Sequence, residues 1–262
     1  MNRDIIKTED TYISNVVLPV CLCIDTSGSM ATTIGGRRTG KFIKIDDCGN
    51  RLVELVEGGT SRIEILEKGI QQFYNATFDD ELARITVLVS IVTFNDTAKR
   101  VQNFVPVVKK DGTVRKTPHF NPNGQTAMGE GINLALDLLD KFKLKYIAKG
   151  VDIYQPWLII MSDGFNNGDP YTLAIAQNRI NDLVAQDKLG VYPFGIGKGA
   201  DLNQLNKLSP KQEAFRLEET QVEKLFKWFI EVSSQVSSGS INGYKSPKLE
   251  HYEVASWAEG LK

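Results

Sequence analysis

The chain has 262 residues, of which 42% are hydrophobic and 24% charged, as in an ordinary soluble globular protein. Its 31 lysines and arginines nearly balance its 32 aspartates and glutamates, which argues against a general nucleic-acid or membrane-surface binder. Residues 1–7 contain charged side chains and lack the apolar core of a signal peptide, and no stretch approaches a membrane-spanning length. We therefore expect a cytoplasmic protein that binds neither nucleic acid nor membrane.

The first long apolar run, residues 16–24, is rich in β-branched side chains and is typical of a buried strand in a parallel sheet. It ends in a turn that carries Asp25, Ser27 and Ser29. Ligands of open α/β sheets bind at the carboxyl ends of the strands. A carboxylate and two hydroxyls presented there suit a hard divalent cation such as Mg²⁺. The alternative is a polar turn without a ligand.

The same strand carries two of the three cysteines, Cys21 and Cys23. Side chains two residues apart on a strand point to one face, so we expect both cysteines to be small core residues on the same side of the sheet. An odd number of cysteines without a secretory signal is typical of a reduced compartment.

Residues 31–60 separate this turn from the first predicted helix. The β-prone runs 42–45 and 51–56 flank a cluster of Asp, Gly and Asn, which predicts an inserted β-hairpin. The segment from Gly35 to Lys41 also approaches a phosphate-binding loop. No strand leads directly into it, however, and Phe42 stands where a magnesium-binding hydroxyl belongs. We interpret the insertion as structural or partner-binding.

Beyond the insertion, predicted helices and strands alternate. Ser61 and Glu64 have the spacing of a capping box, and Asp169 before Pro170 is a typical helix start. Amphipathic patterns predict one helix after each of these two starts. Two further helices are predicted through residues 132–142 and 222–232. The further predicted strands are 85–94, 99–105 (an antiparallel edge strand), 157–162, 190–199 and 213–217.

Two later positions add oxygen donors. Thr126 follows the polar loop 107–125 and directly precedes a helical pattern, so its hydroxyl is suited either to capping that helix or to binding a cation. Asp163 directly follows the apolar strand 157–162, as Asp25 completes the first strand.

Together these segments resemble the metal-ion-dependent adhesion site of von Willebrand factor A (vWA) domains, and the resemblance extends over residues 16–238. It implies a three-layer, Rossmann-like α/β fold with a mainly parallel central sheet, one antiparallel edge strand and helices on both faces. Residues 1–15 would then be an N-terminal extension, and residues 239–262 a tail made of a linker and a short docking segment. The five positions that match the metal site are Asp25, Ser27, Ser29, Thr126 and Asp163.

The resemblance also implies how the site works. The two serines would bind Mg²⁺ (or Mn²⁺ or Ca²⁺) directly, Thr126 directly or through water, and the two aspartates through bound waters. Neutral hydroxyls leave the charge of the cation incompletely neutralised, so the open position favours an anion. In vWA domains this anion is typically a Glu or Asp of another protein. The resemblance therefore implies a metal-dependent protein-binding module and no enzymatic activity.

Two alternatives remain open at this stage. One is a metal-dependent phosphohydrolase or phosphotransferase. A haloacid-dehalogenase-like enzyme needs a second Asp two residues after the first, where this chain has Ser27, and neither Asp25 nor Asp163 has a Lys, His or Glu companion in its motif. The other alternative is a structural vWA scaffold that does not use metal.

Within the vWA family, the segment Leu18-Pro19-Val20 before the metal turn and the single-domain layout resemble the bacterial TerY/YegL-like group, which is linked to tellurite resistance and stress response. That group is often encoded beside a protein kinase and a metal-dependent Ser/Thr phosphatase, which become candidate partners. The insertion at residues 31–60 is atypical of the group.

Overall fold

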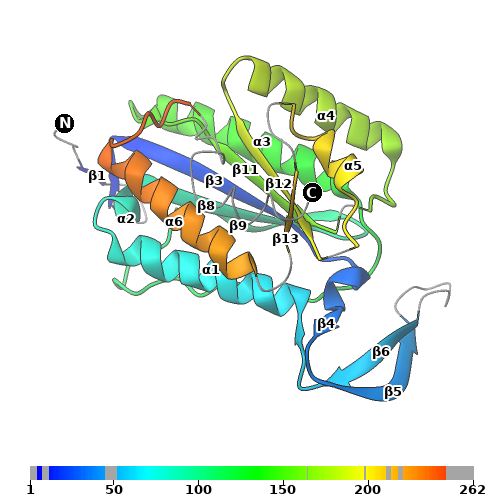
Figure 1. Cartoon of the computed structure of the whole chain (residues 1–262). Coiled ribbons are helices and arrows are strands. Elements are labelled where there is room, and N and C mark those ends of the chain that lie inside the picture. The colour runs from blue at the N-terminus through cyan, green and yellow to red at the C-terminus, as the bar shows by residue number, and fades with distance from the viewer. Residues whose placement is uncertain are drawn as a thin grey trace.

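The fold is built on one central sheet with helices on both faces (Figure 1). The computed structural model describes residues 5–7, 12–44, 52–163, 165–197, 199–210, 214–217 and 221–245. The strands of the central sheet, in spatial order, are β13 (Phe215–Leu217), β12 (Gly190–Ile196), β11 (Trp157–Ser162), β3 (Val16–Asp25), β8 (Val87–Phe94) and β9 (Ala98–Pro106).

The sheet is parallel except at one edge. β9 pairs antiparallel with β8, whereas β13, β12, β11, β3 and β8 pair in parallel along the order given. A short seventh strand, β10 (Asp152–Ile153), which the sequence analysis did not predict, pairs in parallel with the start of β3. The mainly parallel sheet with one antiparallel edge strand is confirmed.

Strand β3 lies in the middle of this sheet, between β11 and β8, and its side chains alternate between two cores. Leu18, Leu22 and Ile24 contribute to the core shared with α1 (Arg62–Asp79) and α6 (Val222–Ser238). Cys21 and Cys23 contribute to the opposite core, shared with α3 (Met128–Ile147) and α4 (Pro170–Ala185), which confirms their predicted common face. Burial raises the pKa of the Cys21 thiol to about 12, so this cysteine is an inert core residue.

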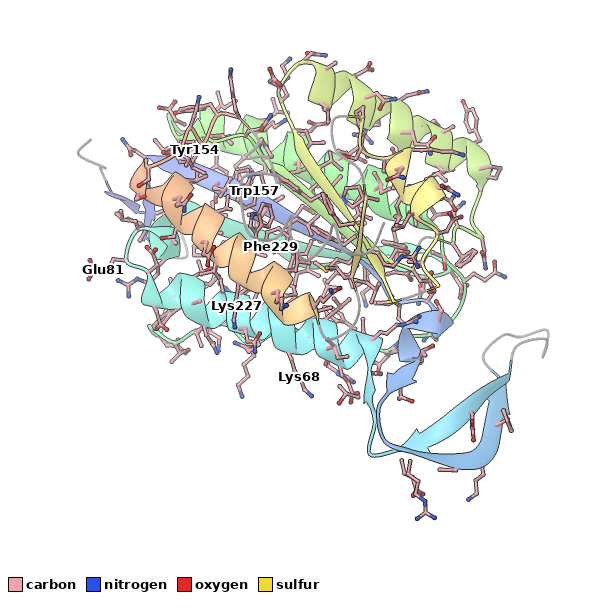
Figure 2. All side chains as sticks on the ribbon, in the orientation of Figure 1. Lys68, Glu81, Tyr154, Trp157, Lys227 and Phe229 are labelled. Carbon is pink, nitrogen blue, oxygen red and sulfur yellow. The ribbon has the colours of Figure 1, made fainter. Side chains whose placement is uncertain are left out.

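Helix α6 is fixed to the sheet by aromatic packing. The ring of Trp157 on β11 stacks against Trp228 of α6 at a centroid distance of 6.3 Å and lies 6.4 Å from Phe229. Figure 2 shows Trp157 and Phe229 meeting between the sheet and α6. Large buried rings remove much apolar surface from water, and this stabilises the packing of α6 on the sheet.

The predicted helix starts are present. Ser61 and Glu64 form a reciprocal capping box at α1, and Asp169 accepts hydrogen bonds from the backbone of Tyr171 and Thr172 at α4. Two strand boundaries outside the insertion were wrong. A single helical turn, α2 (Ala83–Thr86), occupies the first two residues of the strand predicted at 85–94, and the strand predicted at 190–199 ends at Ile196.

The insertion begins directly after the turn at the end of β3. One 3₁₀ turn, η1 (Gly28–Ala31), leads into β4 (Thr33–Ile34) and β5 (Arg37–Lys44). The chain returns through β6 (Leu52–Glu57) and β7 (Thr60–Ser61). β5 pairs antiparallel with β6, and β4 with β7, so the inserted β-hairpin is confirmed. Figure 1 shows β5 and β6 standing clear of the sheet and helices.

Strand β5 is longer than predicted. The first predicted β-prone run begins at Phe42, but β5 already begins at Arg37. The pairing register shifts between Arg38 and Phe42, a segment that contains Gly40 at a φ of +71°. Glycine adopts this conformation without steric cost, and such a bulge lets the strand continue through an irregular step. The predicted turn at residues 46–50, with Cys48, lies outside the described residues.

The two ends of the chain add small elements. β1 (Ile5–Lys7) pairs antiparallel with β2 (Tyr12–Ser14), a hairpin that was not predicted within residues 1–15. Helix α6 ends at Ser238, with Gly239 as its C-cap residue. The next residues return to the domain, where the ring of Tyr244 lies 5.1 Å from that of Tyr154. Residues 246–262 of the predicted tail at 239–262 lie outside the described part of the chain. Within that part, no helix combines the length and apolar character needed to cross a membrane.

Candidate metal centre

The two predicted acidic residues lie at the carboxyl ends of neighbouring strands. β3 and β11 pair in parallel with Ile24 opposite Met161, so Asp25 and Asp163 follow at the same edge of the sheet. Asp25 is fully buried and Asp163 is 4% exposed. Parallel pairing thus brings together two carboxyl groups that are 138 positions apart in numbering.

Both carboxylate oxygens of Asp25 accept hydrogen bonds from the protein. The backbone N–H of Ser27 donates to Oδ1 over 2.8 Å, and the hydroxyl of Ser162 donates to Oδ2 over 2.6 Å. Ser162 is not among the five predicted site residues. It is the last residue of β11, and only the pairing of β11 with β3 places it beside Asp25.

The electrostatics of this pair favour a cation. Burial and, to a smaller extent, the negative charge of Asp163 raise the pKa of Asp25 to about 7, although the hydrogen bonds from Ser162 and Ser27 partly oppose this rise. Two carboxyl groups buried side by side are unfavourable when both are ionised. A divalent cation beside them would neutralise this charge and return Asp25 to its ionised form.

The predicted hydroxyl ligands are also paired. The Oγ atoms of Ser27 and Ser29 lie 3.0 Å apart, and both side chains are buried. Backbone hydrogen bonds from Met30 to Ser27 and from Thr32 to Ser29 hold the turn that presents them. Two neutral oxygens are therefore fixed next to Asp25 within one turn of chain.

The loop before Thr126 is attached to this turn through the backbone. The N–H of Gly28 donates to the carbonyl of Gly124 (3.0 Å), and the N–H of Asn123 donates to that of Thr26 (2.9 Å). Gly124 has a φ of +67°, and a Cβ atom there would lie 2.3 Å from the Asp96 carboxylate, so the loop requires glycine at this point. Thr126, 4% exposed, thus lies at the same edge as the two aspartates.

Thr126 does not cap the following helix, which was one of its two predicted roles. α3 begins at Met128, its N-cap residue is Ala127, and no side chain of the N-cap residue makes a capping bond. The Oδ1 atom of Asn166, from the loop after β11, accepts the Met128 N–H instead, over 3.1 Å. Asn166 is a second residue at the site that was not predicted, because its partner lies 38 residues away in the sequence.

The donor set is poor in charge. Among the described residues, no three His, Cys, Asp or Glu side chains gather into one cluster. The five predicted residues instead combine two carboxylates with three hydroxyls, and oxygen donors of this kind suit Mg²⁺, Mn²⁺ or Ca²⁺ better than softer metals. The buried carboxyl pair and the adjacent serine hydroxyls fit a hard divalent cation.

No protein-family model matches the chain, and no curated protein sequence matches it. Solved structures do resemble it. The proximal thread matrix protein 1 from the mussel byssus has a TM-score of 0.51 at 16% identity, over 84% of this chain and 48% of that one. A von Willebrand factor type A from Catenulispora acidiphila has a TM-score of 0.51 at 16% identity, over 85% of this chain and 44% of that one.

A mutant of the PilB minor pilin from Streptococcus sanguinis gives a TM-score of 0.50 at 16% identity, over 86% of this chain and 63% of that one. The chain thus spans less than two thirds of each of these proteins. At such low identity the similarity concerns the fold alone, and the fold is that of a von Willebrand factor type A domain.

Proposed function

We propose that this chain is a protein-binding module that captures an acidic residue of a partner protein through a metal ion held at the carboxyl edge of its sheet. The observation that carries the proposal is the pair of buried hydroxyls, Ser27 Oγ and Ser29 Oγ, 3.0 Å apart beside the buried carboxylate of Asp25. Ser27, Ser29 and Thr126 would hold the cation, with Asp25 and Asp163 supplying negative charge behind them.

The chemistry of these donors explains the choice of ligand. When bound, the cation supplies a positive charge and an open position for an oxygen ligand. Hydroxyls are neutral, and the carboxylate oxygens of Asp25 already accept bonds from Ser27 and Ser162. Little negative charge therefore touches the cation directly, which favours a Glu or Asp side chain of a partner at the open position. We propose Mg²⁺ as the ion, and Mn²⁺ and Ca²⁺ suit the same oxygen donors.

The geometry of Asp25 favours binding over phosphoryl-transfer chemistry. A nucleophilic aspartate must approach a phosphorus atom with a free oxygen. Asp25 is fully buried and both of its oxygens are hydrogen-bonded within the protein. We therefore propose that the site recognises a carboxylate and does not catalyse a reaction.

The inserted hairpin gives the proposed partner a second contact. It leaves the domain directly after η1, so its base is beside the candidate metal centre. Arg37 and Lys41 of β5 are exposed, and the side chain of Phe42 is 60% exposed. A two-stranded ribbon by itself is marginally stable in water, so a partner that covers it would stabilise it. We propose that the basic residues attract the acidic partner segment toward the metal.

The biological setting of the proposal comes from the sequence resemblance to the TerY/YegL-like group. On that basis we propose a cytoplasmic role in a bacterial stress-response or tellurite-resistance assembly. The partners to examine first are a protein kinase and a metal-dependent Ser/Thr phosphatase.

One experiment tests the function directly. Wild-type protein and Ser29→Ala are titrated with Mg²⁺ in a calorimeter, and both are then used for affinity purification with and without EDTA. We expect Mg²⁺ binding and EDTA-sensitive partner capture by the wild type, and loss of both in Ser29→Ala. Ser233→Ala, which removes a buried hydroxyl on α6, is the matched control and should behave as the wild type. Equal heats from wild type and Ser29→Ala would remove the site from the proposal.

A further inference from the structure

We propose that Asn166 is a positioning residue that holds Thr126 at a fixed place relative to Asp163. The inference rests on the proposed metal-binding function, because its measurable consequence is the affinity for the cation. Asn166 lies three residues after Asp163, and the N–H group that it caps belongs to Met128, two residues after Thr126. It thus connects the two segments that bring distant donors to the turn at Asp25.

Asn166 makes two hydrogen bonds through its side chain and one through its backbone. Its Oδ1 accepts the backbone N–H of Met128 over 3.1 Å, and its Nδ2 donates to the carbonyl of Gly168 over 3.1 Å. Its own backbone N–H donates to Oε1 of Gln204, on α5 (Leu202–Asn206), over 3.2 Å. The two side-chain bonds orient the amide that caps α3, and the backbone bond attaches Asn166 to α5.

The backbone that follows Asn166 also binds the segment that carries Thr126. The N–H groups of Asn167 and Gly168 both donate to the carbonyl of Thr126, each over 3.1 Å. A Cβ atom at Gly168 would lie 2.7 Å from Cα of Ala127, so the two chain segments are in close contact. The loop that follows Asp163 is thus laid directly on the segment that carries Thr126.

Helix α3 depends on this loop because its own N-cap residue, Ala127, provides no side-chain acceptor for the first N–H groups of the helix. The first N–H groups of a helix lack partners within the helix, and an Ala at the N-cap has no side-chain acceptor. Without Asn166, the Met128 N–H would need water, and the start of α3 would be free to shift. Residues that orient metal ligands are known to change metal affinity by about tenfold to 100-fold when removed.

The chain offers a matched control on the same helix. The Nδ2 atom of Asn133 donates to the carbonyls of Gly129 (2.9 Å) and Thr172 (3.0 Å), and so also joins α3 to α4. Like Asn166, it is partly buried. Its Oδ1 also accepts a hydrogen bond from Nη1 of Arg179 over 3.1 Å. None of these contacts involves Thr126 or Asp163, so Asn133→Ala removes at least as many side-chain hydrogen bonds as Asn166→Ala without releasing the proposed ligands.

The experiment is a Mg²⁺ titration by calorimetry of the wild type, Asn166→Ala and Asn133→Ala, with thermal unfolding of each in EDTA. We expect about tenfold weaker Mg²⁺ binding in Asn166→Ala, unchanged binding in Asn133→Ala and similar losses of stability in both. Asn166→Asp keeps an acceptor for Met128 and should recover the affinity. Asn166→Ala combined with Asn167→Asp carries the same added charge without the cap and should not recover it.

Two results would overturn the inference: equal Mg²⁺ affinity in wild type and Asn166→Ala, or equal recovery in the two charged variants. If the wild type binds no Mg²⁺, the proposed function fails. Amide exchange in the metal-free protein then tests whether Asn166 still positions the segment at Thr126. Exchange at Thr126–Gly129 that is faster in Asn166→Ala than in Asn133→Ala supports the positioning role. Identical exchange in these two variants contradicts it.

Discussion

The hydroxyl of Ser162 donates a hydrogen bond of 2.6 Å to Oδ2 of Asp25 and thereby joins the last residue of β11 to the last residue of β3. Both residues are fully buried. The bond stabilises the ionised form of a carboxylate that burial and the neighbouring Asp163 otherwise disfavour. The turn that carries Asp25, Ser27 and Ser29 is thus supported by a residue of the neighbouring strand that is not one of the five predicted ligands.

Removing this hydroxyl should weaken the proposed metal centre. In Ser162→Ala, Asp25 loses a donor to its charged form, so we expect its pKa to rise further and Mg²⁺ affinity to fall about tenfold. Unfolding by urea should show a loss of about 1–3 kcal/mol. Ser162→Thr keeps the hydroxyl and should restore binding.

The control for Ser162→Ala is Ser90→Ala, which removes a buried hydroxyl that donates to the Gln102 carbonyl on the β8–β9 side of the sheet. It should lower stability and leave Mg²⁺ binding unchanged. Equal Mg²⁺ affinities in wild type and Ser162→Ala would show that Ser162 has no part in the site.

The raised pKa of Asp25 predicts how stability depends on pH. Its pKa is about 7 in the folded protein, against an ordinary value of 3.8 when the chain is unfolded. Between these values the folded state binds more protons than the unfolded state. The contribution of Asp25 to the stability of the metal-free protein is therefore complete below pH 3.8 and is lost as the pH rises through about 7.

Urea unfolding in EDTA across this pH range measures the effect against Asp25→Asn, which cannot titrate at this position. The free energy of unfolding of the wild type should fall relative to that of Asp25→Asn as the pH rises. Addition of Mg²⁺ should reduce the fall, because a cation favours the ionised carboxylate. Parallel pH profiles for the two proteins in EDTA would contradict the shifted pKa.

The proposed binding role predicts an absence of turnover. Purified protein with Mg²⁺ or Mn²⁺ should not hydrolyse nucleotides or general phosphatase substrates, because the oxygens of Asp25 are buried and hydrogen-bonded. Phosphate release above that of a buffer blank is the measurement. Turnover that disappears in Ser27→Ala would overturn the binding interpretation and favour the enzymatic one.

Removal of the inserted hairpin should separate metal binding from partner binding. Replacing residues 35–58 with a short Gly/Ser linker keeps β4 paired with β7 and keeps the bond from the Arg62 N–H to the Thr32 carbonyl. We expect the thermal unfolding and the Mg²⁺ affinity of this variant to be close to those of the wild type. EDTA-sensitive capture of the partner should be lost.

The exposed ring of Phe42 offers a smaller change in the same hairpin. Phe42→Ala should weaken partner capture without changing Mg²⁺ affinity, since the ring is 60% exposed and supports no core. If the variant that lacks residues 35–58 captures the partner with unchanged affinity, the insertion has no part in partner binding.

The sequence by itself determined the features that depend on neighbours along the chain. The bond from Ser27 to Asp25 and the contact between Ser27 and Ser29 each span two residues, so the spacing of the motif already contains them. The capping box of Ser61 and Glu64 spans three. The buried strands were predictable because continuous apolar runs are typical of parallel strands covered on both faces.

Only the tertiary structure decided which distant residues meet at the site. Ser162 reaches Asp25 across 137 residues because β11 pairs with β3 in one register, and Asn166 caps Met128 because its loop crosses the start of α3. The early start of β5 likewise depends on its pairing with β6. Side-chain periodicity reports which face of an element is buried, whereas the choice of partner and register is made by packing and backbone hydrogen bonds between elements.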